Sequence, residues 1–226
     1  TMFKSVAPKK SLRFDVVGQV LTAIFGGQLK AGDRLIVTRL AADFGVSATP
    51  AREALLELTH FGVVELLPNK GAVVRPLGPQ QVREIYALRS LLESEATRLA
   101  CGRIPSQQLE ELRQRTSQLL AGGAVPQWST QAHRSDLELH DLIARNCGNE
   151  RLTDEIERYS RLVRVAQSVL VDAQTLEKLA QAQHLKILNA LLAGQADAAA
   201  NCMAEHIQSA CEVLVAALFP KAEPVN

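Results

Sequence analysis

Three histidines and one aspartate stand where helices of this chain would otherwise carry apolar residues. Asp136 and His140 are four positions apart in SDLELHDLIA, so on a helix both share the face of Ile143. His184 lies in AQAQHLKILNALL and His206 in CMAEHIQSACEVLV, each again with aliphatic neighbours on its own face. Carboxylate and imidazole groups on buried faces need polar partners, because leaving them unpaired is costly.

Two explanations are open for these four residues. A histidine on an apolar face is more often a core residue with its own hydrogen-bond partner than a metal ligand. A divalent metal, however, gives all four groups one shared partner, with Asp136 and His140 reaching it from consecutive turns and two imidazoles completing three nitrogens and one oxygen. We expect Zn²⁺, with Ni²⁺, Mn²⁺ or Fe²⁺ as alternatives, and one to three open coordination positions.

The elements that must position these side chains are helices. From Pro79 onward the pattern is rich in Leu and Ala and is broken only briefly, by Gly and Pro. Connections this short force neighbouring helices to run antiparallel, so an all-α bundle is expected. The expected helices span residues 79–102, 105–122, 127–147, 150–171, 174–194 and 196–219.

The composition of the 226 residues agrees with a helical, globular chain. Hydrophobic residues make up 47% and aromatic residues only 4%, which favours helices over a β-sandwich. No stretch approaches the roughly eighteen apolar residues of a membrane span, so no membrane contact is expected. The four cysteines lie inside helical patterns without paired spacing, which is typical of reduced thiols in the cytoplasm.

The first 78 residues differ in pattern and charge from the rest. They hold ten Lys and Arg against six Asp and Glu, while residues 79–226 hold fifteen against eighteen. The pattern begins with a helical stripe over 12–25 and a turn around Gly32. It continues with a short helix in TRLAADFG, a second helix in VSATPAREALLELTHFG and two β-prone runs, VVELL and AVVR. This order predicts a winged helix-turn-helix, with a small packing module as the alternative.

The same segment resembles the DNA-binding domain of the GntR family of bacterial transcription regulators over about residues 12–77. The resemblance is carried by LAADFGVSATPAREAL, preceded by GGQLKAGDRL and followed by GVVELLPNKGAVV. It implies that DNA is contacted by the start of the second helix, by the wing tip and by nearby arginines: Arg34, Arg39, Ser47, Thr49, Arg52, Lys70 and Gly71. Two departures, Ala48 where the family usually has Arg and Thr38 where it often has a basic residue, bear on which operator is read.

The helical region resembles the FCD ligand-binding domain of the FadR subfamily of GntR regulators, in the VanR-like branch with six helices. The resemblance is carried by EIYALRSLLESEATRLA, DLELHDLIARNCGNERL and HLKILNALLAGQADAAANCMAEHI, within residues 79–215. It implies that Asp136, His140, His184 and His206 bind the metal. Because relatives commonly sense small carboxylates, it also implies a cationic clamp, for which Arg89 and Arg161 are the candidates. The alternative for each arginine is a structural ion pair, with Glu93 one turn from Arg89.

The resulting hypothesis is a mainly α protein with a winged helix-turn-helix at 10–77 and an FCD-type metal-binding and dimerisation bundle at 79–220. It is expected to be a cytoplasmic bacterial homodimer and to bind a palindromic operator as a repressor released by a small organic acid. Two other functions use the same ligands: a metal-dependent enzyme, and a sensor of the metal ion itself. The sequence shows no additional base, nucleophile or phosphate loop, so we do not expect an enzyme.

Overall fold

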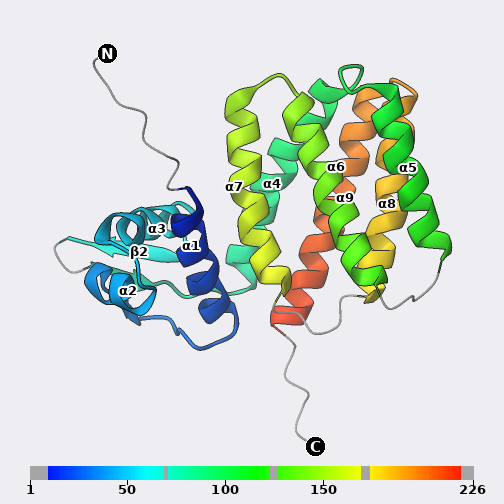
Figure 1. The fold of residues 1–226 in the computed structure, drawn as a ribbon. Coiled ribbons are helices and arrows are strands. Elements are labelled where there is room, and N and C mark those ends of the chain that lie inside the picture. The colour runs from blue at the N-terminus through cyan, green and yellow to red at the C-terminus, as the bar shows by residue number, and fades with distance from the viewer. Residues whose placement is uncertain (1–9, 69–70, 123–126, 169–173, 220–226) are drawn as a thin grey trace, which may run out of the picture. The chain divides into compact units, whose positions relative to one another are not determined.

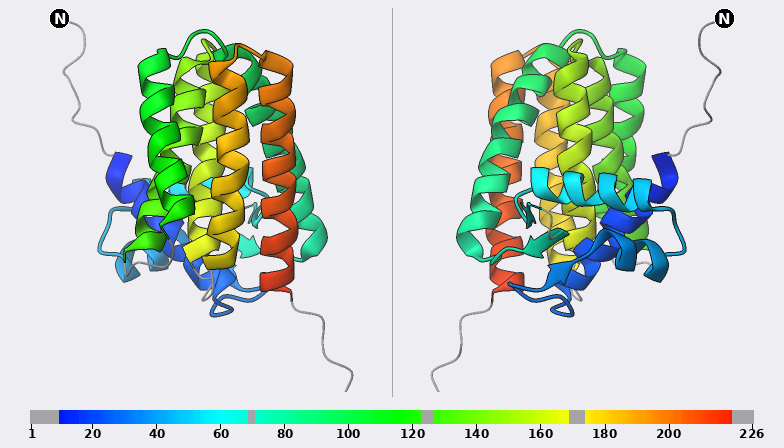
Figure 2. Two further views of the ribbon diagram at one scale, coloured as in Figure 1. Left: turned by 90° about the vertical axis from the view of Figure 1, so that its right-hand side faces the viewer. Right: turned by 90° about the vertical axis from the view of Figure 1, so that its left-hand side faces the viewer.

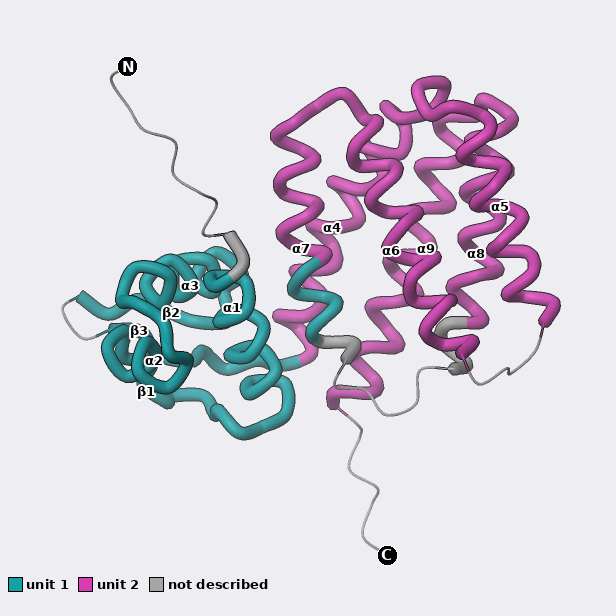
Figure 3. Tube along the Cα trace, viewed as in Figure 1, with its two compact units in different colours: residues 1–78, 161–169 teal, residues 79–160, 170–226 magenta. Residues whose placement is uncertain are grey.

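The computed structural model describes residues 10–68, 71–122, 127–168 and 174–219 (Figure 1). The chain divides into two compact units (Figure 3). Unit 1 consists of residues 1–78 and 161–169, and unit 2 consists of residues 79–160 and 170–226. The sequence had placed all of 150–171 in the helical region, so the assignment of 161–169 to unit 1 is a difference.

Unit 1 combines three helices with a small sheet. Its first helix packs on the third, which also packs on the second, and the strands lie in the order β1-β3-β2 with both pairs antiparallel. Buried aliphatic side chains such as Leu21, Leu55 and Leu58 fill the interior between these elements. The elements are α1 (Lys10–Phe25), β1 (Arg34–Leu35), α2 (Val37–Asp43), α3 (Ala48–His60), β2 (Val64–Leu67) and β3 (Gly71–Val74).

The helix pair of unit 1 is set by local sequence signals. Gly45 adopts a φ of 61° in the connection between α2 and α3, a backbone conformation that favours glycine. Ser47 is the N-cap of α3, and Pro50 lies in the first turn, where its missing N–H costs no helical hydrogen bond. The predicted winged helix-turn-helix is confirmed. Strand β1 was not predicted, because a two-residue strand leaves no periodic pattern in the sequence.

Gly71 begins β3 for a reason internal to the sheet. Its φ is 83°, and a Cβ built there would lie 2.6 Å from the carbonyl oxygen of Leu35 in β1. A side chain at this position would therefore push β1 away from β3, whether or not DNA is bound to the domain. The sequence analysis assigned Gly71 to the implied DNA contacts at the wing tip, and the close approach that the structure shows is to Leu35.

Unit 2 is a bundle of helices that lie side by side (Figures 1 and 2). The first and last helices pack together, and α8 contacts α5, α6 and α9. The described helices agree with the expected six to within a few residues, so the predicted bundle is confirmed. They are α4 (Pro79–Ala100), α5 (Ser106–Ala121), α6 (Trp128–Asn146), α7 (Glu150–Ser168), α8 (Gln174–Leu192) and α9 (Ala196–Leu218), with 161–168 of α7 grouped with unit 1.

The bundle interior is largely aliphatic but encloses several polar groups. Ile143, Leu188, Met203 and Ile207 are each at most 2% exposed. All four cysteines are free thiols. Within the described ranges, no helix is long and apolar enough to cross a membrane.

Candidate metal and effector site

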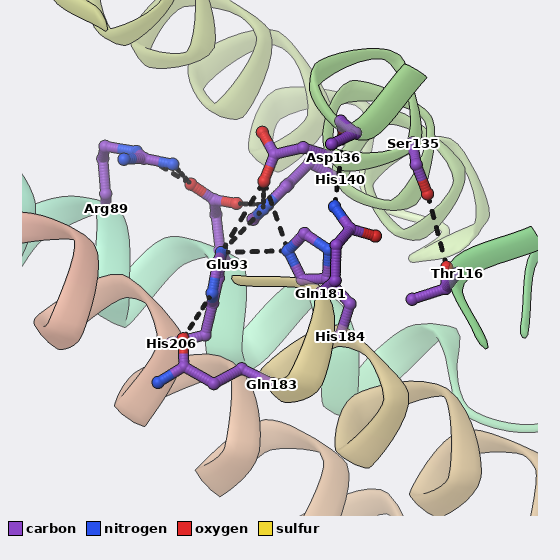
Figure 4. A network of polar contacts seen from close by, with 11 residues as sticks. Arg89, Glu93, Thr116, Ser135, Asp136, His140, Gln181, Gln183, His184 and His206 are labelled. Atoms are coloured by element: carbon purple, nitrogen blue, oxygen red, sulfur yellow. Dashed lines mark hydrogen bonds and ion pairs between the residues drawn. The ribbon is translucent and has the colours of Figure 1, made fainter. Parts of the chain in front are cut away.

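The four residues singled out from the sequence come together inside the bundle (Figure 4). Asp136 and His140 project from consecutive turns of α6, His184 comes from α8, and His206 comes from α9. The three histidines are 6% exposed or less, and the Asp136 side chain is 23% exposed. Asp136 is therefore the member of the group that solvent reaches best.

One oxygen and three nitrogens face a common point. Oδ1 of Asp136 lies 3.2 Å from Nε2 of His184, 3.7 Å from Nε2 of His140 and 3.9 Å from Nε2 of His206. Nε2 of His206 lies 3.3 Å from Nε2 of both His140 and His184. All four ligand atoms lie within 4.8 Å of one another.

The shortest of these separations, 3.2–3.3 Å, are those expected around a divalent transition-metal ion, and the longer ones of 3.7 and 3.9 Å would shorten when an ion binds. Ligand bonds of about 2.0–2.1 Å place neighbouring ligand atoms roughly 3.3–3.4 Å apart around a tetrahedral ion and roughly 3.0 Å apart around an octahedral one. Three imidazole Nε2 atoms turned toward one carboxylate oxygen also have few hydrogen-bond donors to share among them. Asp136, His140, His184 and His206 are thus the residues that could hold a metal.

Two of the histidines are oriented by acceptors behind them. Nδ1 of His140 donates to Oε2 of Glu93 on α4, and Nδ1 of His206 donates to Oε1 of Gln183 at 3.1 Å. Gln183 is itself held by donating from Nε2 to Oγ of Ser209 at 2.9 Å. With the ring proton on Nδ1, the lone pair of each Nε2 faces the cluster, which is the tautomer that a metal requires.

His184 is held differently. Its Nε2 faces Asp136, whereas its Nδ1 is buried without a hydrogen-bond partner. One turn earlier on α8, Gln181 is also buried, with Nε2 donating to the Ala132 carbonyl at 3.2 Å and Oε1 unpartnered. Two unpartnered polar atoms thus lie one turn apart on α8 beside the cluster: Nδ1 of His184, which can donate a hydrogen bond, and Oε1 of Gln181, which can accept one (Figure 4).

The electrostatics of the cluster favour a cation. Burial alone would raise the pKa of Asp136, but the hydrogen bond with His184 and the neighbouring imidazoles hold it well below its usual range, so the carboxylate is ionised. Burial and the nearby His184 and His140 lower the pKa of His206 well below its ordinary value. Against the effect of burial, the Glu93 carboxylate raises the pKa of His140, which makes that ring a more basic ligand.

Arg89 meets the cluster through Glu93. Its Nε and Nη2 lie 3.0 Å and 2.9 Å from Oε1 of Glu93, and both side chains are buried. Arg89 and His140 outweigh burial and lower the pKa of Glu93, so one ionised carboxylate links the guanidinium on α4 to the imidazole on α6. The ion pair foreseen as the structural alternative is present, and it lies next to the cluster rather than away from it.

Glu93→Gln should lower the free energy of unfolding of the metal-free protein by about 3–5 kcal/mol, because it leaves the buried Arg89 without a counter-charge. The control is Glu95→Gln on the same helix, whose side chain is 48% exposed and pairs with Arg98. Such a solvent-exposed pair contributes little to stability, because water screens the two charges. Urea denaturation of both variants measures the difference, and equal losses would show that Glu93 does not compensate Arg89.

Arg161, the second candidate for the effector clamp, lies in an ion-pair and aromatic environment of unit 1. Its Nη2 lies 3.1 Å from Oε1 of Glu57, and its guanidinium stacks 4.4 Å from the centre of the Phe14 ring. Arg13 shares both partners, with its Nε 3.2 Å from Oε2 of Glu57 and its guanidinium 4.5 Å from the Phe14 ring. All these residues belong to unit 1, and the described polar contacts of Arg161 include none of the four cluster residues.

Comparison with known proteins agrees with both halves of this architecture. Residues 84–209 match the FCD domain, and residues 12–74 match the bacterial regulatory proteins of the gntR family. The chain belongs to the GntR family. It is a transcriptional regulator with a DNA-binding helix-turn-helix domain and an FCD ligand-binding domain.

Several GntR relatives are similar along most of their length. The Nta operon transcriptional regulator of Aminobacter aminovorans is 32% identical over 79% of this chain and 83% of its own. The transcriptional repressor RspR of Escherichia coli is 26% identical over 80% of this chain and 79% of its own. The structure of McbR/YncC of Escherichia coli superposes with a TM-score of 0.64 at 26% identity, covering 90% of this chain and 97% of that one.

The residues predicted to contact DNA in this GntR domain are mostly exposed. Arg34, Arg39, Ser47, Thr49 and Arg52 are all on the surface. Among the described residues, Arg34 and Arg52 have no ion-pair partner, whereas Nε of Arg39 lies 3.8 Å from Asp43. The hydroxyl of Ser47 makes no capping hydrogen bond, so it is free to donate to another acceptor. Lys70 lies outside the described residues.

Sequence reasoning missed part of the site. Glu93 was foreseen as a partner of Arg89 but not of His140, and no role was given to Gln181 or Gln183. The available signal was their helical position, since both glutamines precede His184 within one turn. Tyr86, one turn before Arg89, was also given no role, and its buried hydroxyl is the unsatisfied group closest to Arg89 along α4.

Proposed function

We propose that this GntR regulator is a repressor that senses a small carboxylate through a divalent metal in its FCD domain. The metal is expected to be zinc, with nickel, manganese or iron as alternatives, held by Asp136, His140, His184 and His206. The observation that carries the proposal is the convergence of these four ligand atoms within 4.8 Å in a chain that also has a winged helix. A bound ion would supply open coordination positions for an oxygen of the acid.

The residues around the cluster support an anionic ligand. Arg89 is buried beside the cluster and is the cation that would hold a carboxylate, because its planar guanidinium donates several N–H groups. The contacts of Arg161 with Glu57 and Phe14 favour Arg89 as the effector clamp. Glu93 keeps both residues in place, because its two carboxylate oxygens accept hydrogen bonds from Arg89 and from His140.

The winged helix is proposed to read a palindromic operator as part of a homodimer. Arg52, Thr49 and Ser47 would meet the major groove and its phosphates from the first turns of α3, with Arg34, Arg39, Lys70 and Gly71 contributing nearby. The FCD domain is proposed to dimerise. Leu88 and Leu91, one turn apart on α4, are 40% and 72% exposed, so this face of the helix offers apolar side chains to such an interface.

Two alternatives use the same ligands and are separable. In an enzyme the acid would be consumed, and in a direct metal sensor DNA affinity would follow the metal concentration without any acid. The attached GntR helix-turn-helix favours sensing over turnover. The relative RspR is named a transcriptional repressor, which supports repression, rather than activation, as the effect of this protein on its target genes.

The test measures binding to duplexes selected by this protein from a random pool, using metal-loaded and chelator-stripped protein with a panel of small organic acids. We expect an acid to release the DNA only when metal is present. The same acid at a hundred times its Kd should stabilise the loaded protein by about 2.7 kcal/mol in a thermal melt. Release by metal alone would support the metal sensor, disappearance of the acid by NMR would support the enzyme, and no response to any acid would contradict acid sensing.

A further inference from the structure

Tyr86 places an unsatisfied hydroxyl in the interior of the FCD domain. The residue is 3% exposed, and no described group hydrogen-bonds to its OH. A buried polar atom without a partner is uncommon in folded proteins and costly to maintain. An isolated phenol of this kind therefore points to a ligand or a water molecule that completes it.

The Tyr86 side chain lies next to the charged groups of the proposed effector site. The Arg89 guanidinium lies 4.8 Å from the centre of the Tyr86 ring, one helical turn away on α4. Burial raises the pKa of Tyr86 to about 12, and the charges of Arg89, Asp136 and Glu93 also act on it, so the phenol lies within electrostatic reach of the cluster. It is protonated near neutral pH and can donate a hydrogen bond.

Arg89 has donors left for the same ligand. Its Nε and Nη2 are turned to Oε1 of Glu93, and its Nη1 makes no hydrogen bond to any described residue. A phenol O–H and a guanidinium N–H one turn apart form a pair of donors that suits an anionic oxygen.

The balance of charge limits what the ligand can be. Asp136 and Glu93 contribute two negative charges and Arg89 one positive charge, while His140, His184 and His206 are neutral as metal ligands. A divalent ion then leaves the buried site with one net positive charge. A monoanion neutralises it, whereas a dianion leaves an uncompensated negative charge, which is expensive in a buried site.

We infer that Tyr86 is a ligand-binding residue, and that the effector is a monocarboxylate whose carboxylate accepts hydrogen bonds from the Tyr86 hydroxyl and Arg89. This inference rests on the proposed acid-sensing function and specifies its ligand class. It assigns Tyr86 a role in binding affinity rather than in stability of the fold.

The test uses the full-length, zinc-loaded protein, the isosteric variant Tyr86→Phe, and matched monocarboxylates and dicarboxylates: propionate and succinate, and lactate and malate. Calorimetry measures each Kd. For wild type we expect the monocarboxylate of each pair to bind more tightly. We expect Tyr86→Phe to weaken the monocarboxylate roughly tenfold or more, because a hydrogen bond to a charged group is lost. Its ligand-free melting midpoint should equal or exceed that of wild type, since the deleted hydroxyl had no protein partner.

The outcomes separate this inference from the function on which it rests. If wild type binds no acid in a zinc-dependent manner, acid sensing and this inference both fail. If wild type binds a monocarboxylate and Tyr86→Phe binds it with an unchanged Kd, acid sensing stands and the role of Tyr86 is wrong. A Tyr86→Phe variant that melts earlier without ligand and keeps its affinity would show that the hydroxyl is satisfied by a structural water. Tighter binding of the dicarboxylates would refute the charge argument.

Discussion

Asp136→Asn should weaken zinc binding by at least about a hundredfold while leaving the helical content unchanged. A carboxamide has the shape of the carboxylate, but it removes the one negative charge among the four ligands and is a poor ligand for zinc. Loss of a group that merely orients a ligand typically costs 10–100-fold in metal affinity, so loss of a ligand itself should cost more. Competition with a chromogenic chelator measures the affinity.

A matched control lies one turn and a residue further along the same helix. Asp141 is 45% exposed and pairs with Arg145 at 3.6 Å, so Asp141→Asn removes the same charge from α6 without touching the cluster. Its zinc affinity should match wild type. At a zinc concentration a hundred times the wild-type Kd, the wild type and this control should gain about 2.7 kcal/mol, most of which Asp136→Asn forfeits. Equal zinc affinities for the two variants would mean that Asp136 does not bind the ion.

The positions of the four cluster residues show how much of the site helical periodicity can predict. The four-residue spacing of Asp136 and His140 already puts both on one helix face, and the apolar neighbours of His184 and His206 indicate burial. Helical periodicity thus determines which side chains point inward, and the short connections determine that the helices are antiparallel neighbours. These two inferences were enough to predict that the four residues meet.

Contacts that depend on exact helix packing were beyond the same signals. Whether Glu93 reaches across to His140 as well as along α4 to Arg89 depends on the spacing of α4 and α6, which no periodicity specifies. Arg161 shares its helix with apolar residues, so its pattern fits an inward position as well as the observed pairing with Glu57 of α3. Strand β1 likewise has no periodic signal in the sequence, because its two residues are a strand only through their pairing with β3.

Arg52→Ala should reduce affinity for the selected operator by roughly thirtyfold or more. Arg52 is exposed in the first turns of α3 and, within the described residues, has no ion-pair partner to be released from, so its full interaction with DNA is available. A bidentate contact between arginine and guanine is worth about 1–3 kcal/mol. A dimer on a palindrome loses it at both half-sites, which amounts to about 2–6 kcal/mol. Fluorescence anisotropy at fixed salt measures the change.

The effect of Arg52→Ala on sequence preference distinguishes base recognition from simple charge attraction. If Arg52 reads a base, affinity for the operator falls while affinity for sheared non-specific DNA falls much less; if it contacts only phosphate, both fall together and the dependence on salt becomes shallower. Arg134→Ala is the control, since Arg134 is exposed on α6 of the FCD domain, outside the winged helix. It removes the same charge, so a loss equal to that of Arg52→Ala would show that net charge alone explains the result. Ala48 stands beside Ser47, where the family usually has arginine, so we expect Arg52 to carry a larger share of the recognition in this chain. Restoring that arginine by Ala48→Arg should then shift which operators are selected.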